Sequence, residues 1–400
     1  MRPILTFCAL VLALPIPLQG QRERAPRRPR LAAGADTNDA QAYLQQGHRV
    51  LEQNPGAAAN AYYWAVRIDP ASAAALYSLR MAVLMQRPTP FRAYMEGNRR
   101  VIFSREMRAN DSLMFRALQM DPFLHLQHSR VVQFRYWRQI VESDPALAGT
   151  NPGRVDFIIE DLFNRTPPGT RARLAAAEGR FDYAIRLYGE AIEASKKPAY
   201  LYLDRGGVYA LQGMNAPAIR DIGIGLTELK KEDADEEEDV VFYDSKALYE
   251  YSIGVLWLRQ GDVEQARLAF GRAMEEDLSF YPAHTALARL ALETGDTATA
   301  LSEMALAAEL APREAAVHYQ HGELLLAAGE AADAVAPLRK AIELEPYYAN
   351  PQFTLAETLA RTSDAAGARE AYQRFLALAT RRDPRRAAAT AALTADGGAP

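Results

Sequence analysis

Two pairs of histidines stand at a spacing that can place both side chains on one face of a helix. They are His125 with His128 and His318 with His321, each pair three residues apart. Two imidazoles on one face are the beginning of a zinc site, which needs further ligands. No cysteine stands beside either pair, and two histidines alone do not make a site. We therefore expect no metal site and no cofactor.

The acidic run EDADEEED, residues 232–239, is a second candidate for binding a cation. A calcium loop needs oxygen ligands at set positions and a glycine for its turn, and this run has no glycine. We interpret it as a solvated loop, extended by its own charge repulsion, within an insertion at about 230–244. Contact with a basic partner, such as the arginine-rich segment of this chain, is the alternative.

The sequence carries none of the common catalytic signatures. It has no glycine-rich phosphate loop, no G-x-S-x-G elbow and no H-E-x-x-H motif. The only cysteine, Cys8, excludes an internal disulfide and a zinc site made of cysteine pairs. We expect a non-enzymatic protein with no catalytic residues. An enzymatic or ligand-binding helical domain at 73–164 is the alternative.

Composition indicates a folded protein without affinity for nucleic acid. Hydrophobic residues make up 49% of the chain and charged residues 24%. The 46 basic and 50 acidic residues give a net charge of −4, so that no overall basic field attracts a polyanion.

The N-terminus has the layout of an export signal. Residues 1–20 contain a positive start, an apolar run and two prolines, and we predict a signal peptide and a periplasmic or secreted protein with no integral membrane span after cleavage. Residues 21–38 are read as a flexible, basic linker rich in proline and arginine. Its arginines resist translocation, and an uncleaved segment that anchors the protein to a membrane is therefore the alternative.

The elements that would position any site are helices that repeat. Residues of turn type recur at intervals of 34, with one interval of 48, at Gly179, Gly213, Gly261, Gly295, Gly329 and Ser363. Five residues after each stands an alanine: Ala184, Ala218, Ala266, Ala300, Ala334 and Ala368. Glycine permits a turn with positive φ, and alanine allows two helices to approach closely.

This frame resembles the tetratricopeptide repeat (TPR), in which 34 residues form two antiparallel helices. The resemblance covers 165–380 and implies an all-α fold, an α-solenoid of helix pairs with a less regular helical N-terminal part. Residues 58–70 repeat the second-helix pattern, which indicates an N-terminal TPR-like unit at 39–72. We predict an irregular helical region at 73–164, with degenerate repeats as one interpretation, and a disordered tail at 381–400.

The resemblance also implies a function and a surface. In this family the first helices line a concave groove that holds a peptide or partner protein, and the chain is expected to be a protein-interaction scaffold. The residues carried over to that groove are Tyr200, Leu203, Tyr251, Val255, Arg289, Tyr319, Glu323, Phe353 and Glu357. A self-associating architectural scaffold is a further alternative, because Tyr372 and Phe375 close the last unit without an obvious capping helix. The sequence leaves the oligomeric state open.

Overall fold

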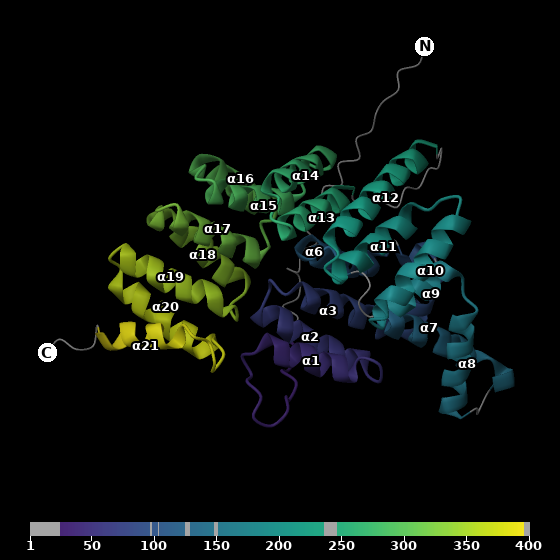
Figure 1. The fold of residues 1–400 in the computed structure, drawn as a ribbon. Coiled ribbons are helices and arrows are strands. Elements are labelled where there is room, and N and C mark those ends of the chain that lie inside the picture. The colour runs from purple at the N-terminus through teal and green to yellow at the C-terminus, as the bar shows by residue number, and fades with distance from the viewer. Residues whose placement is uncertain are drawn as a thin grey trace, which may run out of the picture.

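The computed structural model describes residues 25–96, 98–102, 104–124, 129–147, 151–235 and 246–395 (Figure 1). Across these ranges the chain forms 21 α-helices and no strand, and the prediction of an all-α solenoid is confirmed. No helix in them is both long and apolar enough to cross a membrane. The predicted signal peptide, His125 with His128, and residues 236–239 of the acidic run lie outside the described residues.

Six helix pairs form the array, α9–α20. Each first helix packs along its own second helix, and each second helix packs against the next pair. The pairs are α9 (Pro168–Ala177) with α10 (Phe181–Ala194), α11 (Ala199–Leu211) with α12 (Asn215–Asp235), α13 (Lys246–Arg259) with α14 (Val263–Glu276), α15 (Tyr281–Glu293) with α16 (Thr297–Leu310), α17 (Ala315–Ala327) with α18 (Ala331–Leu344), and α19 (Ala349–Arg361) with α20 (Ala365–Leu378).

The recurring glycines end the first helices. All five adopt φ between 74° and 91°, and Ser363 adopts the same left-handed conformation at φ 66°. At the first turn, the amide of Arg180 donates to the carbonyl of Ala175 and the amide of Gly179 to that of Ala176. This is the Schellman pattern, which satisfies carbonyls that the end of a helix leaves free. The same pair of bonds closes the last turn, at Ser363 and Asp364.

Small residues let the paired helices touch. A Cβ added at Gly206 would lie 2.6 Å from the side chain of Ile222, and one added at Gly254 would overlap the ring of Phe270. Phe270 is fully buried, as are the alanines that recur five residues after most of the turns. The frame therefore recurs because each contact between paired helices needs one small and one large side chain.

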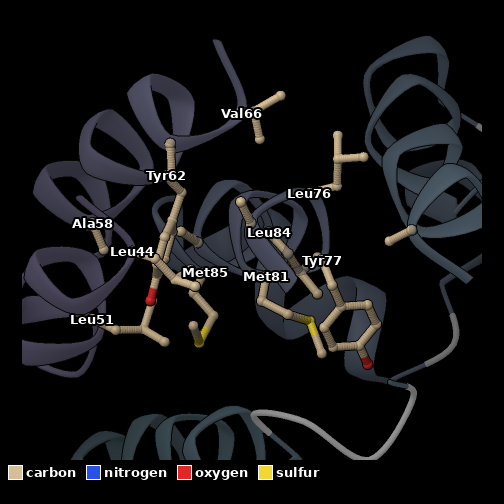
Figure 2. Packing of buried hydrophobic residues seen from close by; sticks show 14 of the residues in the cluster. Leu44, Leu51, Ala58, Tyr62, Val66, Leu76, Tyr77, Met81, Leu84 and Met85 are labelled. Carbon is tan, nitrogen blue, oxygen red and sulfur yellow. The ribbon is translucent and has the colours of Figure 1, made fainter. Parts of the chain in front are cut away.

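An N-terminal body, residues 25–120, precedes the array. Its helices are α1 (Ala40–Val50), α2 (Pro55–Ile68), α3 (Ala73–Met85), α4 (Pro88–Met95), α5 (Arg99–Ile102) and α6 (Arg105–Met120). Helix α3 packs on both α2 and α6, with the short α4 and α5 inserted between α3 and α6. Tyr62, Leu76 and Met85 are buried among these helices (Figure 2). The insertion explains why this region departs from the spacing of tandem repeats.

Two further helices join the body to the array. Helix α7 (Ser129–Ser143) contacts α3 and α4 on one side and α9 on the other. Helix α8 (Pro152–Asn164) packs on α7, and Val155, Ile159 and Phe163 form a small apolar cluster with it. The region 73–164 is thus helical over its described residues.

Both segments expected to be unstructured are ordered over their described parts, which corrects the sequence analysis. In the expected linker, the carbonyl of Pro26 accepts a hydrogen bond from the Trp64 indole at 2.9 Å. The expected tail contains α21 (Arg386–Ala395), which packs on α20. Its Ala389 belongs to the apolar cluster that buries Phe375 completely. Helix α21 is thus the capping helix that the sequence analysis did not find.

Candidate functional site

The N-terminal body lies inside the curve of the array. In Figure 1, α1–α3 and α6 stand between α9–α11 on one side and α19–α21 on the other, with α13–α18 along a third. Leu248 on α13 and Tyr347, just before α19, pack against the core of the body. The concave side of the array is therefore covered in part by the protein's own helices.

Charged and aromatic side chains join the two parts. Arg116 on α6 faces both carboxylate oxygens of Glu314, with Nε 2.6 Å from Oε1 and Nη2 2.8 Å from Oε2. Arg67 on α2 places its Nε 3.0 Å from the Glu345 carboxylate. Burial raises the pKa of Glu345 to about 7, although Arg67 and Arg116 act to lower it. The arginines come from the body and the glutamates from the array.

A pocket of about 570 Å³ remains open between the body and the array. Its walls come from α13, α15 and α17, with Gln119 and Met120 at the end of α6. The polar lining residues are Gln119, Tyr251, Tyr281, Thr285, Arg289, Gln320 and Glu323. Met120, Leu292, Met304 and Leu324 supply apolar surface.

The helix pairs, their 34-residue spacing and their left-handed turns are those of a tetratricopeptide-repeat (TPR) array. No family model and no curated protein sequence matches the chain.

Solved TPR structures align with about half of the chain. The C-terminal part of a TPR repeat-containing protein from Cytophaga hutchinsonii is 16% identical over 52% of this chain and 78% of its own, with a TM-score of 0.43. YrrB, described as a TPR protein with an unusual peptide-binding site, is 18% identical over 52% and 97%, with a TM-score of 0.39. MamA from Desulfovibrio magneticus RS-1 is 18% identical over 46% and 96%, with a TM-score of 0.37.

The pocket combines groups of both charges. Arg289 is exposed in the opening and lies near Tyr251, whose pKa burial raises to about 12 against the influence of Arg289. The Glu323 carboxylate accepts a hydrogen bond from the Tyr319 hydroxyl, and burial raises the pKa of Glu323. The buried hydroxyl of Tyr281 has no hydrogen-bond partner among the described residues. Such an arrangement can hold a polar chain through charges and hydrogen bonds.

Of the nine predicted groove residues, three line this pocket: Tyr251, Arg289 and Glu323. Tyr319 lies next to it, with its ring edge-on to Tyr348 at 5.4 Å between centroids. Tyr200 is 44% exposed, and Val255 and Glu357 are partly exposed, but none of the three lines the pocket.

Leu203 and Phe353 correct the groove assignment, because both are buried in the array. Leu203 is 5% exposed and fills the space beside Gly225 on the paired helix. Phe353 is 8% exposed and packs against Phe375, with 5.0 Å between the ring centroids. Both side chains therefore stabilise helix packing and do not face a partner.

The sequence analysis missed the wall that the N-terminal body contributes. Gln119 and Met120 stand at the end of α6, within the region for which the sequence predicts only irregular helix. The fold-back that brings them to α17 depends on contacts such as Arg116 with Glu314, which are 198 residues apart in the sequence. No local pattern marks such a pair.

The second histidine pair, His318 with His321, is part of the helix packing. His318 and His321 both lie on α17, and the imidazole Nε2 of His318 is 3.1 Å from the carbonyl of Pro312. Burial lowers the pKa of His321, and His318 adds to this effect. Among the described residues, no group of three or more His, Cys, Asp or Glu side chains could hold a metal ion.

Proposed function

We propose that this TPR protein is a non-enzymatic scaffold that holds a short segment of a partner protein in the pocket between α6, α13, α15 and α17. The observation that carries the proposal is the composition of the pocket. Arg289 and Glu323 offer opposite charges, the amides of Gln119 and Gln320 can bond to a peptide backbone, and apolar side chains lie beside them. Binding sites commonly combine apolar surface with a few polar groups that fix orientation.

The volume favours a short segment as the occupant. A pocket of about 570 Å³ lies within the range of roughly 300–1,000 Å³ that is usual for ligand sites. An α-helix with its side chains is about 10–12 Å across, so that the pocket would accommodate roughly one turn. A few extended residues, anchored by charge at one point and by apolar contact at another, fit this space better than a whole helix.

The two tyrosines of the pocket are better suited to binding than to catalysis. A general acid or base works best with a pKa near the operating pH. Burial raises the pKa of the Tyr251 hydroxyl to about 12 and also raises that of Tyr281, which keeps both hydroxyls neutral. Neutral phenols donate hydrogen bonds to a bound chain and are poor bases.

Site-specific photo-crosslinking in the native host tests the proposal. A benzophenone amino acid placed at Gln320 should form a discrete adduct with a partner protein. The same amino acid at Arg339, exposed on the outer helix α18, should not. Arg289→Ala together with Glu323→Ala should reduce the Gln320 adduct at unchanged protein level. An adduct that persists in the double variant, or forms equally from Arg339, would refute the pocket as the binding site.

We also propose that the protein is exported, on the basis of the apolar run in residues 1–20. Sequencing the N-terminus of the protein from its native host tests this proposal. A mature chain that begins near Gln21 is expected, and retention of Met1 on a protein found in the cytoplasm would contradict export.

A further inference from the structure

The N-terminal body and the array each have a core of their own. Over the described residues, the core of the body is formed by side chains of α1–α7, and the array contributes to it Leu248 and Tyr347, the second in edge contact with Trp64. Both of these are partly buried. The array buries its apolar residues between its own helices. The body and the array therefore do not share one apolar core across the concave side, as two parts of a single rigid unit would.

The attachment differs between the two ends of the body. At one end α7 packs on α3 and α4 and also on α9, and Phe123 is buried beside α11–α13 under the guanidinium of Arg259, 4.8 Å from the ring centroid. This end is anchored by close helix packing. It is therefore the natural pivot for any movement of the body.

At the other end, long polar side chains make the contact. Arg116 meets Glu314 and Arg67 meets Glu345, as described above. The Asn38 amide donates to the carbonyl of Ala377 at 2.9 Å, and Asp36 pairs with Arg381. These groups are partly open to water; the Arg116 and Glu314 side chains, for example, are 33% and 13% exposed. Ion pairs in this setting are weakened by salt.

Arg28 adds a stacked contact at the same end. Its guanidinium lies 4.4 Å from the ring centroid of Trp64 on α2 and 5.0 Å from that of Tyr347 in the array. It thereby links a ring of the body to a ring of the array by cation–π attraction. The three basic groups Arg28, Arg67 and Arg116 all belong to the body and all meet acidic or aromatic groups of the array.

We propose that the N-terminal body is a hinged cover on the array, held closed by the ion pair of Arg116 with Glu314 and by the polar contact of Arg67 with Glu345. Opening turns α1–α3 away from α19 and α20 about the pivot at Phe123 and α7, and breaks the contact of Arg116 with Glu314. It widens the space between the body and the array and gives a partner protein access to the concave side. That opening controls the access of a partner protein rests on the proposed function. That the body opens away from the array does not.

Small-angle X-ray scattering of the full chain tests the cover, with charge reversal as the perturbation. The wild-type radius of gyration at low salt, where the ion pairs are strongest, is the reference value for the closed protein. Arg116→Glu should raise the radius of gyration measurably at physiological salt, since Glu314 would then face a like charge. Arg116→Glu combined with Glu314→Arg should restore the wild-type value.

The matched control is Arg267→Glu, the same change of charge in an exposed pair on α14. It should leave the radius unchanged. Circular dichroism tests whether each variant is folded. If Arg116→Glu loses helicity, a salt titration of the wild-type protein is used in place of that variant. The wild-type radius should then increase between low and high salt. A radius unaffected by both charge reversal and salt would overturn the cover.

The partner experiment separates this inference from the proposed function. Opening by Arg116→Glu should raise the yield of the Gln320 photo-adduct several-fold. An opened protein with an unchanged adduct yield would overturn the control of access. The absence of a partner adduct from wild type and opened variant alike would instead refute the proposed function.

Discussion

Replacing Ser363 by glycine should stabilise the protein. Ser363 stands in the sixth turn of the array with φ 66°, where the five equivalent turns have glycine. The left-handed conformation costs a residue with a Cβ roughly 1–2 kcal/mol. Glycine avoids this cost but adds about 0.4–1 kcal/mol of conformational entropy to the unfolded chain. The expected gain is therefore on the order of 0.5–1 kcal/mol.

The reverse substitution supplies the matched control. Gly329 has φ 91°, and a Cβ added there would meet no atom within 4 Å. Gly329→Ser should therefore lose a similar free energy through backbone strain alone. Ser363 is exposed, so that its replacement by glycine should cost little side-chain packing.

Equilibrium unfolding in urea and hydrogen exchange of α19 and α20 measure both changes. Hydrogen exchange is included because repeat arrays can unfold in parts, and a single unfolding free energy would then average over them. The Ser363→Gly protein should exchange more slowly at the C-terminal end of α19, and the Gly329→Ser protein faster at the end of α17. A neutral or destabilising Ser363→Gly would refute the argument that backbone conformation selects glycine at these turns.

Three further predictions concern helix pairing, pH and the C-terminal cap. Gly254→Ala should lower the free energy of unfolding by about 1–3 kcal/mol, because the added Cβ would overlap the ring of Phe270. Gly271 also lies in a helix, but a Cβ added there would meet no atom within 4 Å. Gly271→Ala should therefore raise the free energy of unfolding by about 0.5–1 kcal/mol in the same urea assay. The pKa of Glu345 is about 7 in the folded protein, against an ordinary value of 4.5, so the folded state binds this proton more tightly than the unfolded chain does. The free energy of unfolding should therefore fall as the pH rises from 5 to 8. Glu345→Gln should flatten this pH dependence of the melting temperature. Removal of residues 386–400 should lower the urea midpoint and cause concentration-dependent association in sedimentation, because Phe375 would lose its cover.

The repeat array could be predicted from the sequence because its geometry imposes residue types at fixed positions. A left-handed turn selects glycine, and close helix contacts select pairs such as Gly254 with Phe270. These requirements recur every 34 residues and stand out from the variable positions between them. The TPR resemblance followed from this constraint.

The arrangement of the N-terminal body could not be predicted in the same way. It depends on individual long-range pairs, and neither Arg116 nor Glu314 is distinguishable in sequence from other charged residues on helices. The groove assignment failed at Leu203 and Phe353 because the frame identifies the helix on which a residue lies but not how far its side chain turns toward the paired helix. Helix α21 was missed because an alanine-rich segment next to proline and arginine is recognisable as a cap only when Phe375 is known to need cover.

A crosslink across the pocket tests most directly the claim that the N-terminal body lies inside the curve of the array. Gln119 and Gln320 line the same pocket from α6 and α17. In a Cys8→Ser background, cysteines at these two positions should be joined within one chain by a short bismaleimide, and peptide mapping would identify the product. Cysteines at positions 119 and 339 should not be joined. Failure of the 119–320 pair to react within a folded monomer, or equal reaction of the control pair, would contradict the account.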